Sequence, residues 1–297
     1  MDDGIIYVKR TERNECGGTD ATLDTKAPHE IESNDIVYFS AGSALGYVFD
    51  DGMSDHLYRF DAFAAKSDAG TFLYLRTEDD RNSAPELSIV TVKEDVLPAL
   101  AALVRECGLA DGNGYHSTTH GLPENFGGEV DVLFSSGERI SFSDNQSPII
   151  SYENALKIVE FMKDAMAKET AAFPDPDTIV SVAFSNEWED GYVRATLTVS
   201  PDGTGTNAKE SRYGESVYNS EKAVDAETVS KIKDTVKRFN MLSWSGLPES
   251  GYWGRGNKSL AFTFKDGAVI AVKDDRKLPF DVGNGFFNIE LELSTKH

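Results

Sequence analysis

The sequence predicts an α+β protein made of two tandem, diverged repeats, each an antiparallel sheet of two hairpins packed with one or two helices. Three observations support this prediction. The segment GLPENFGG at 121–128 is answered by GLPESGYWG at 246–254, an amphipathic helix pattern precedes each copy, and a glycine-centred hairpin pattern follows each copy. A chain of 297 residues is long for one compact core, so we expect two domains, 1–170 and 171–297.

Each repeat is expected to open with a hairpin, because aromatic and β-branched residues flank a turn that contains glycine. The predicted strands are 58–64 and 71–76 around Gly70 in copy one, and 182–186 and 192–199 around Gly191 in copy two. On this alignment, residues 58–167 should superpose on 178–297.

A helix follows the first hairpin in each copy, because apolar residues recur at a spacing of three and four. Its apolar faces are Val96, Leu100, Leu103, Val104 and Cys107 in copy one, and Val229, Ile232, Val236 and Phe239 in copy two. Asp95 and Asp225 are the expected N-caps, and Gly108 is the expected C-terminal stop. Pro98 is compatible with this helix only in its first turn.

The GLPE loop and a second hairpin come next, with turns at Gly137 and Gly267. Copy one then continues with a helix from Ser151, and PDPD at 174–177 is predicted to be the linker. The C-terminal segment 287–294 alternates like a strand, but the duplication favours a helix there.

The N-terminal fifty-odd residues have no counterpart in copy two. Their strand-like segments 4–10 and 35–40 are expected to extend the first sheet.

Composition limits the classes of function. Hydrophobic residues make up 40% of the chain, which is typical of a folded protein, and the net charge is −21. A charge of this sign repels nucleic acid and anionic membranes, so neither is an expected partner. The two cysteines, Cys16 and Cys107, lie far apart in the sequence and do not indicate a disulfide framework.

The start of the chain and its hydropathy bear on where the protein resides. The N-terminus lacks the basic start and apolar core of a signal peptide, and no apolar run is long enough to span a membrane. We therefore expect a cytoplasmic protein without membrane insertion, or a secreted or surface-attached one if a leader precedes Met1 in nature.

A short pattern in copy two resembles a known group of proteins. It consists of a helix, a loop containing Trp or GLP, a DG hairpin, and polar residues closed by proline, with 244–249, 262–267 and 274–279 carrying the likeness. The pattern resembles uncharacterised proteins of Gram-positive gut bacteria. This resemblance implies a fold and a bacterial source, but no activity and no catalytic residues.

Metal and cofactor signals are weak. His116 and His120 lie four residues apart, with Cys107 upstream, and imidazole with thiolate is a reasonable zinc set. The surrounding Ser, Thr and Gly residues indicate a surface loop instead, so we expect neither a metal nor a cofactor. Segments 143–147 and 273–277 offer oxygen ligands for calcium without the spacing of a known calcium loop, and turn chemistry explains them.

Paired carboxylates are the candidate catalytic groups, because hydrolysis of a glycosidic bond needs an acid and a base or nucleophile. Glu124 and Asp144 in copy one correspond to Glu249 and Asp274 in copy two. Acidic residues are abundant in this chain, so their recurrence is a weak signal.

The Gly-rich segment 251–257 lacks the residues of a phosphate loop or a dinucleotide fingerprint. Its Tyr252, Trp253 and Arg255, with Trp244 nearby, are types enriched at binding hot spots. The alternative is that the tryptophans pack in their own domain. We expect a non-catalytic binding or protein-interaction protein that contacts an unknown protein or small molecule; the alternative is a hydrolase that uses acidic residues in a cleft between the repeats.

Overall fold

The computed structural model describes residues 5–10, 18–45, 57–79, 84–121, 127–247, 257–274 and 280–294, of which 5–10, 57, 257, 274 and 280–282 are described by their backbone alone. The chain divides into two compact units. Unit 1 contains residues 1–66 and 70–170, and unit 2 contains residues 67–69 and 171–297. Each unit is an α+β structure with one sheet.

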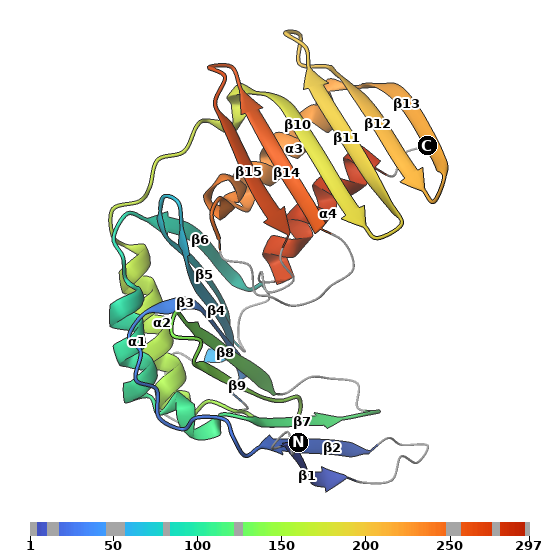
Figure 1. The fold of residues 1–297 in the computed structure, drawn as a ribbon. Helices are drawn as coiled ribbons and strands as arrows, with labels where there is room; N and C mark the ends of the chain where they lie inside the picture. Colours follow the sequence, from blue (N-terminus) through green and yellow to red (C-terminus); the bar gives the residue numbers. More distant parts are fainter. Residues whose placement is uncertain are drawn as a thin grey trace. The chain divides into compact units, whose positions relative to one another are not determined.

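The sheet of unit 1 has nine strands in the order β1-β2-β7-β9-β8-β3-β4-β5-β6 (Figure 1). The strands are β1 (Ile5–Arg10), β2 (Thr19–Asp24), β3 (Ile36–Ala44), β4 (Leu57–Ser67), β5 (Gly70–Asp79), β6 (Glu86–Val92), β7 (Tyr115–Thr119), β8 (Gly128–Phe134) and β9 (Arg139–Asp144). The pair β7–β9 is parallel, whereas β1–β2, β2–β7, β8–β9, β3–β8, β3–β4 and β5–β6 are antiparallel.

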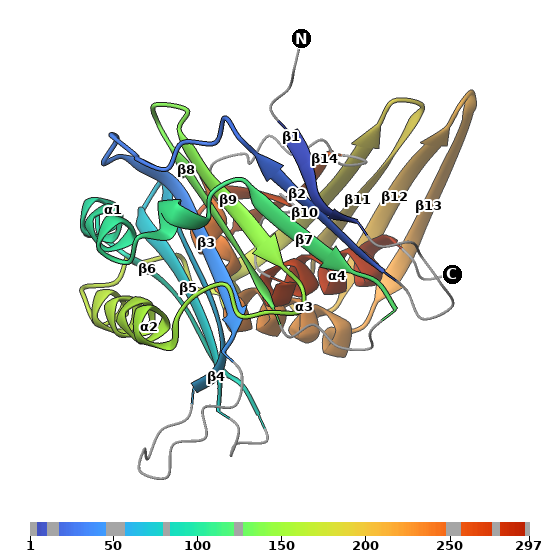
Figure 2. The same cartoon turned by 90° about the horizontal axis from the view of Figure 1, so that it is seen from below.

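Two helices, α1 (Leu97–Glu106) and α2 (Tyr152–Met166), lie side by side on one face of this sheet (Figures 1 and 2). Because successive residues of a strand point to opposite faces, every second residue of the central strands contributes to the core beneath the helices. The core contains, among others, Phe39, Ala41, Ala62, Val130, Val132 and Phe142 from strands and Leu100, Val104, Ile158 and Met162 from helices.

Unit 2 has a six-stranded antiparallel sheet in the order β13-β12-β11-β10-β14-β15. Its strands are β10 (Ile179–Trp188), β11 (Gly191–Val199), β12 (Gly205–Tyr213), β13 (Ser216–Val224), β14 (Asn257–Phe264) and β15 (Val269–Asp274). Helices α3 (Ala226–Arg238) and α4 (Phe280–Ser294) cross one face of the sheet (Figure 1).

The C-terminal segment is helical, although its sequence also alternates like a strand. In α4 the buried side chains are Phe286, Ile289 and Leu293, which recur at helical spacing and face the sheet. The ring of Phe286 meets that of Phe184 on β10 edge to face, with centroids 6.3 Å apart.

The N-terminus of α3 matches the sequence prediction, whereas the N-cap of α1 differs from it. Asp225 is the N-cap of α3, and its Oδ1 accepts the Thr228 N–H at 2.7 Å, which confirms that prediction. In α1 the N-cap is Val96, and Asp95 instead accepts the Leu97 N–H at 3.1 Å. Pro98 lies in the first turn of α1, as its missing N–H requires.

The predicted equivalence of the 58–76 hairpin and the 182–199 hairpin differs by one strand from their places in the two sheets. By place in the sheet, β9-β8-β3-β4-β5-β6 of unit 1 corresponds to β15-β14-β10-β11-β12-β13 of unit 2. The β10–β11 hairpin therefore corresponds to β3–β4, not to β4–β5. The difference arose because β12 and β13 are polar strands with few buried side chains, so their sequences lack the apolar alternation of a half-buried strand.

Two adjacent phenylalanines test how α4 packs. Phe286 is 1% exposed and Phe287 is 50% exposed. We expect Phe286→Ala to lower the free energy of unfolding of unit 2 by about 3–5 kcal/mol, because it leaves a cavity against the sheet. Phe287→Ala should change it by about 0.5 kcal/mol or less. Urea unfolding measures both values, and equal losses for the two variants would contradict this orientation of α4.

Candidate functional site

The acidic residues selected from the sequence do not form a described catalytic pair. Asp144, at the end of β9, accepts the N–H groups of Gln146 and Ser147 at 2.7 and 3.0 Å, so it stabilises a turn. The backbone of Asp274 lies in β15. Glu124 and Glu249 lie outside the described residues.

His116 lies in strand β7, and His120 directly follows it, so the predicted loop is wrong here. Residues four apart on a strand are separated by about 13 Å, too far to bind one ion. His116 Nδ1 lies 3.0 Å from Ser143 Oγ, and His120 Nε2 lies 3.3 Å from Asp20 Oδ2. Within the described part of the chain, no three His, Cys, Asp or Glu side chains gather as a metal-binding set.

Trp244 is 2% exposed and ends the short 3₁₀ helix Met241–Trp244 in the interior of unit 2. It therefore packs in its own domain, which was the alternative to a binding role. Its Nε1 has no hydrogen-bond acceptor among the residues that the structure describes. The other predicted contact residues, Tyr252, Trp253 and Arg255, lie outside those residues.

A row of polar side chains crosses the face of unit 1's sheet opposite the helices. The strand registers pair His116 with Ser143, Ser143 with Glu129, Glu129 with Gly42, and Gly42 with Asp61. We call these five residues the polar row. Directly paired residues point to the same face of a sheet, and Glu129 is exposed while the other side chains are half-buried. The polar row thus offers four functional groups on accessible sheet surface.

Gly42 lies between Glu129 and Asp61 in the polar row and contributes no side chain. A Cβ at this position would lie 2.4 Å from Asp61 Oδ1, so the Asp61 carboxylate leans over the glycine. Burial raises the pKa of Asp61, although Arg59 and Arg76 oppose the shift. Burial lowers the pKa of His116. The row therefore contains a carboxyl group that holds its proton more tightly than usual.

The neighbouring Asp131 belongs to a closed network on the same face. It is 2% exposed and accepts two hydrogen bonds from the Arg139 guanidinium at 2.8 and 2.7 Å and one from Tyr38 Oη at 3.0 Å. A buried carboxylate with these partners is satisfied. We assign it to the structure of the sheet.

An aromatic cluster lies at one end of unit 2's sheet, which we call the aromatic surface: Trp188, Tyr213 and Tyr218. The ring centroids of Trp188 and Tyr213 are 5.6 Å apart, and those of Tyr213 and Tyr218 are 6.5 Å apart. A Cβ on Gly191 would lie 2.8 Å from Trp188 Cζ2, so the indole lies over this glycine. Tyr213 and Tyr218 are 55% and 59% exposed, compared with 36% for Tyr115, and the other tyrosines whose side chains the structure describes are half-buried or buried.

Two hairpin turns fix this end of the sheet. The Gly214 N–H donates to the Asp190 carbonyl at 2.9 Å, and Arg212 Nε donates to the Gly214 carbonyl at 2.8 Å. The same turns contain three exposed acidic residues, which we call the acidic rim: Glu189, Asp190 and Glu215. Aromatic rings and carboxylates thus occur together at one end of unit 2.

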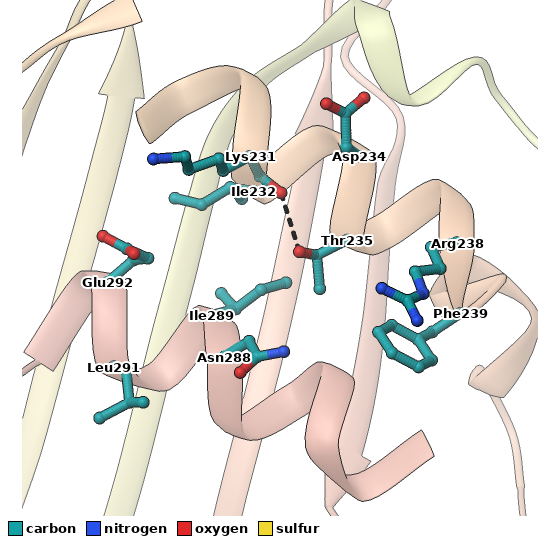
Figure 3. A pocket seen from close by; sticks show the side chains of 10 residues that line it. All are labelled: Lys231, Ile232, Asp234, Thr235, Arg238, Phe239, Asn288, Ile289, Leu291 and Glu292. Carbon is teal, nitrogen blue, oxygen red and sulfur yellow. Dashed lines mark hydrogen bonds between the residues drawn. The ribbon is translucent and has the colours of Figure 1, made fainter. Parts of the chain in front are cut away.

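Two grooves offer little chemistry. One, of about 340 Å³, runs between α3 and α4, and Figure 3 shows its lining side chains, with Thr235 Oγ1 donating to the Lys231 carbonyl at 2.8 Å. The other, of about 400 Å³, lies beside Asp144 in unit 1. Its Asn113 side chain is engaged with the Pro28, Arg139 and Ser141 backbones. Neither groove presents a convergent set of groups for a reaction.

Sequence reasoning missed both the polar row and the aromatic surface. The row joins five strands, so it is visible only once the registers are known. The aromatic surface left a local signal, since EWEDGY and RYGESVY each place aromatic residues on both sides of a glycine turn.

No family model, no curated protein and no solved structure matches this chain. Among the described helices, none has the length and apolar character needed to cross a membrane.

The pKa of Asp61 makes a prediction about stability and pH. Because its folded-state pKa is raised above 3.8, the group favours folding when protonated, and this contribution is lost as the pH rises through the folded-state pKa. We expect Asp61→Asn to unfold at a higher urea concentration than the wild type at pH 7, with the difference shrinking towards pH 4. The exposed Glu86→Gln is the control, and a destabilised Asp61→Asn at pH 7 would refute the burial argument.

Proposed function

We propose that this protein is a non-catalytic binding protein and that the aromatic surface of unit 2 contacts its partner. The observation that carries the proposal is the exposure of Tyr213 and Tyr218 beside Trp188. Aromatic rings grouped on an exposed surface do not gain the free energy that burial would give them, so such a group is typical of an interaction site. Tyrosine and tryptophan are also the residues most enriched at binding hot spots.

We also propose that the two units arose by duplication. Their shared strand order supports this, and so does a matching irregularity in register. The ladder of β3 with β8 shifts between Ile36 and Tyr38, and that of β10 with β14 shifts between Ile179 and Ser181. A bulge at the same place in corresponding strands is typical of common descent, because bulges persist within families.

The connection after each first helix gives independent support. Gly108 follows α1 and Asn240 follows α3, both with left-handed backbone, and a 3₁₀ helix begins at the next residue in each unit. The glycines that open the GLPE loops, Gly121 and Gly246, also both have positive φ, at 80° and 73°.

This correspondence indicates which residues of the polar row the fold itself does not need. If the shifted registers are aligned, the places of Gly42, Glu129 and Asp61 are taken in unit 2 by Ser185, Ser259 and Arg194. The same scaffold is therefore built without the two carboxylates. We infer that the fold of unit 1 does not require them.

The second candidate function is a hydrolase that uses Asp61 and Glu129. It is favoured by the raised pKa of Asp61, which suits a general acid, and by the exposed Glu129 across Gly42, which suits a base. If it holds, Asp61→Asn and Glu129→Gln should each abolish hydrolysis of at least one member of a chromogenic glycoside panel, while Glu86→Gln remains active. Wild-type protein inactive on the whole panel would count against glycoside hydrolysis.

Binding at the aromatic surface is tested by selecting a random phage-displayed peptide library on the immobilised protein. We expect most enriched clones to lose binding by about tenfold or more to Tyr213→Ala and Tyr218→Ala, as hot-spot truncation does. Tyr115→Ala, which removes an exposed tyrosine from unit 1, should leave binding unchanged. Clones that bind all variants equally would contradict the proposal, and urea unfolding verifies that the variants are folded.

A further inference from the structure

The outer strand of unit 2's sheet offers a second feature beside the aromatic surface. All nine residues of β13 pair with β12, and among the residues that the structure describes no strand lies on the other side of β13. Six consecutive residues, 216–221, are exposed. An exposed edge strand of this length presents a row of backbone donors and acceptors that another chain can pair with.

The hairpin geometry identifies the groups that face outward. The β12–β13 turn has two residues, with Gly214 at φ 59°, and its closing pair is Tyr213–Ser216. In such a hairpin the closing pair exchanges both ladder hydrogen bonds, and alternate pairs along the strands do the same. The remaining residues, Val217, Asn219, Glu221 and Ala223, therefore direct their N–H and C=O groups away from β12.

At the turn end of this edge, the side chains favour a cationic partner. Tyr218 lies on β13 itself, and its ring joins Tyr213 and Trp188. Lysine and arginine are attracted to the faces of such rings, and the acidic rim supplies carboxylates in the two adjoining turns. A second copy of the chain would fit less well, because each copy has a net charge of −21.

We propose that an extended, basic peptide segment of a partner protein pairs with β13 as a seventh strand and places its lysine or arginine side chains on the aromatic surface. This inference rests on the proposed binding function and specifies its partner. In strand addition the backbone ladder supplies affinity, and the alternate side chains on one face supply specificity. The residue opposite Tyr218 and its second neighbours along the peptide would lie on the face that carries the rings.

The backbone test compares two substitutions at one position. Asn219→Pro removes an outward N–H and leaves the ladder to β12 intact, whereas Asn219→Ala keeps that N–H. The probe is a nine-residue peptide of alternating threonine and lysine, measured by calorimetry at physiological salt. We expect Asn219→Pro to weaken binding about tenfold or more and Asn219→Ala to change it less than about twofold. Equal affinities for the two variants would overturn strand addition.

Further measurements distinguish failure of the strand-addition proposal from failure of the proposed binding function. A peptide with glutamate in place of lysine should not bind, and equal affinity for both peptides would overturn the requirement for positive charge. If Tyr213→Ala loses binding while Asn219→Pro binds as tightly as the wild type, the aromatic surface remains a binding site and strand pairing is refuted. Absence of binding by the lysine peptide to wild-type protein, while library clones still bind the aromatic surface, would overturn the basic partner alone.

Association through a second copy is also a distinct outcome. Light scattering of the wild type and of Asn219→Pro measures it directly. A wild-type dimer that becomes monomeric in Asn219→Pro would assign the edge to self-association and overturn the proposal, whereas a monomer in both cases supports it.

Discussion

The alternation of side chains across each sheet is the constraint on which the rest of this structure depends. A strand residue points either towards the helices or away from them, so only half of each strand can enter the core beneath the helices. In unit 1 this places Ala41 and Ala62 beneath α1 and α2 while Gly42 and Asp61, one residue further along or back, face the opposite side. On that opposite face Tyr38, Phe63 and Phe72 are also buried, so only its half-buried and exposed residues, such as those of the polar row, are accessible.

Glycine determines which groups the accessible part of each sheet can hold. At Gly42 the missing side chain lets the Asp61 carboxylate lean over the neighbouring strand, and at Gly191 it lets the Trp188 indole lie over the sheet beside Tyr213. A Cβ at either position would meet these groups at less than van der Waals distance. In both units the candidate chemistry thus depends on a strand glycine, which gives up packing in exchange for close approach.

The sequence predicted elements whose signals are local and missed arrangements that depend on register. The helical periodicity of Val229, Ile232 and Val236 identified α3, and the Asp225 cap located its start. The strands β12 and β13 carry no such periodicity, because most of their side chains are exposed. Their omission displaced the predicted alignment of the two halves by one strand relative to the strand order of the two sheets. The polar row could not be predicted either, because it depends on strand register. The pairing of His116 with Ser143 requires the parallel β7–β9 contact, which no local sequence pattern specifies.

The two units carry different side chains at places that match by strand order. Arg194 of β11 pairs with Glu187 on its own sheet, at the place that Asp61 occupies in the other unit. An ion pair on an exposed sheet surface contributes little stability. Asp61 also forms an ion pair, with Arg59 Nε at 3.6 Å, but burial raises its pKa. Asp61 of unit 1 thus carries a carboxyl group whose charged form burial disfavours, and unit 2 exposes the rings of Tyr213 and Tyr218; the two proposed functions rest on these features.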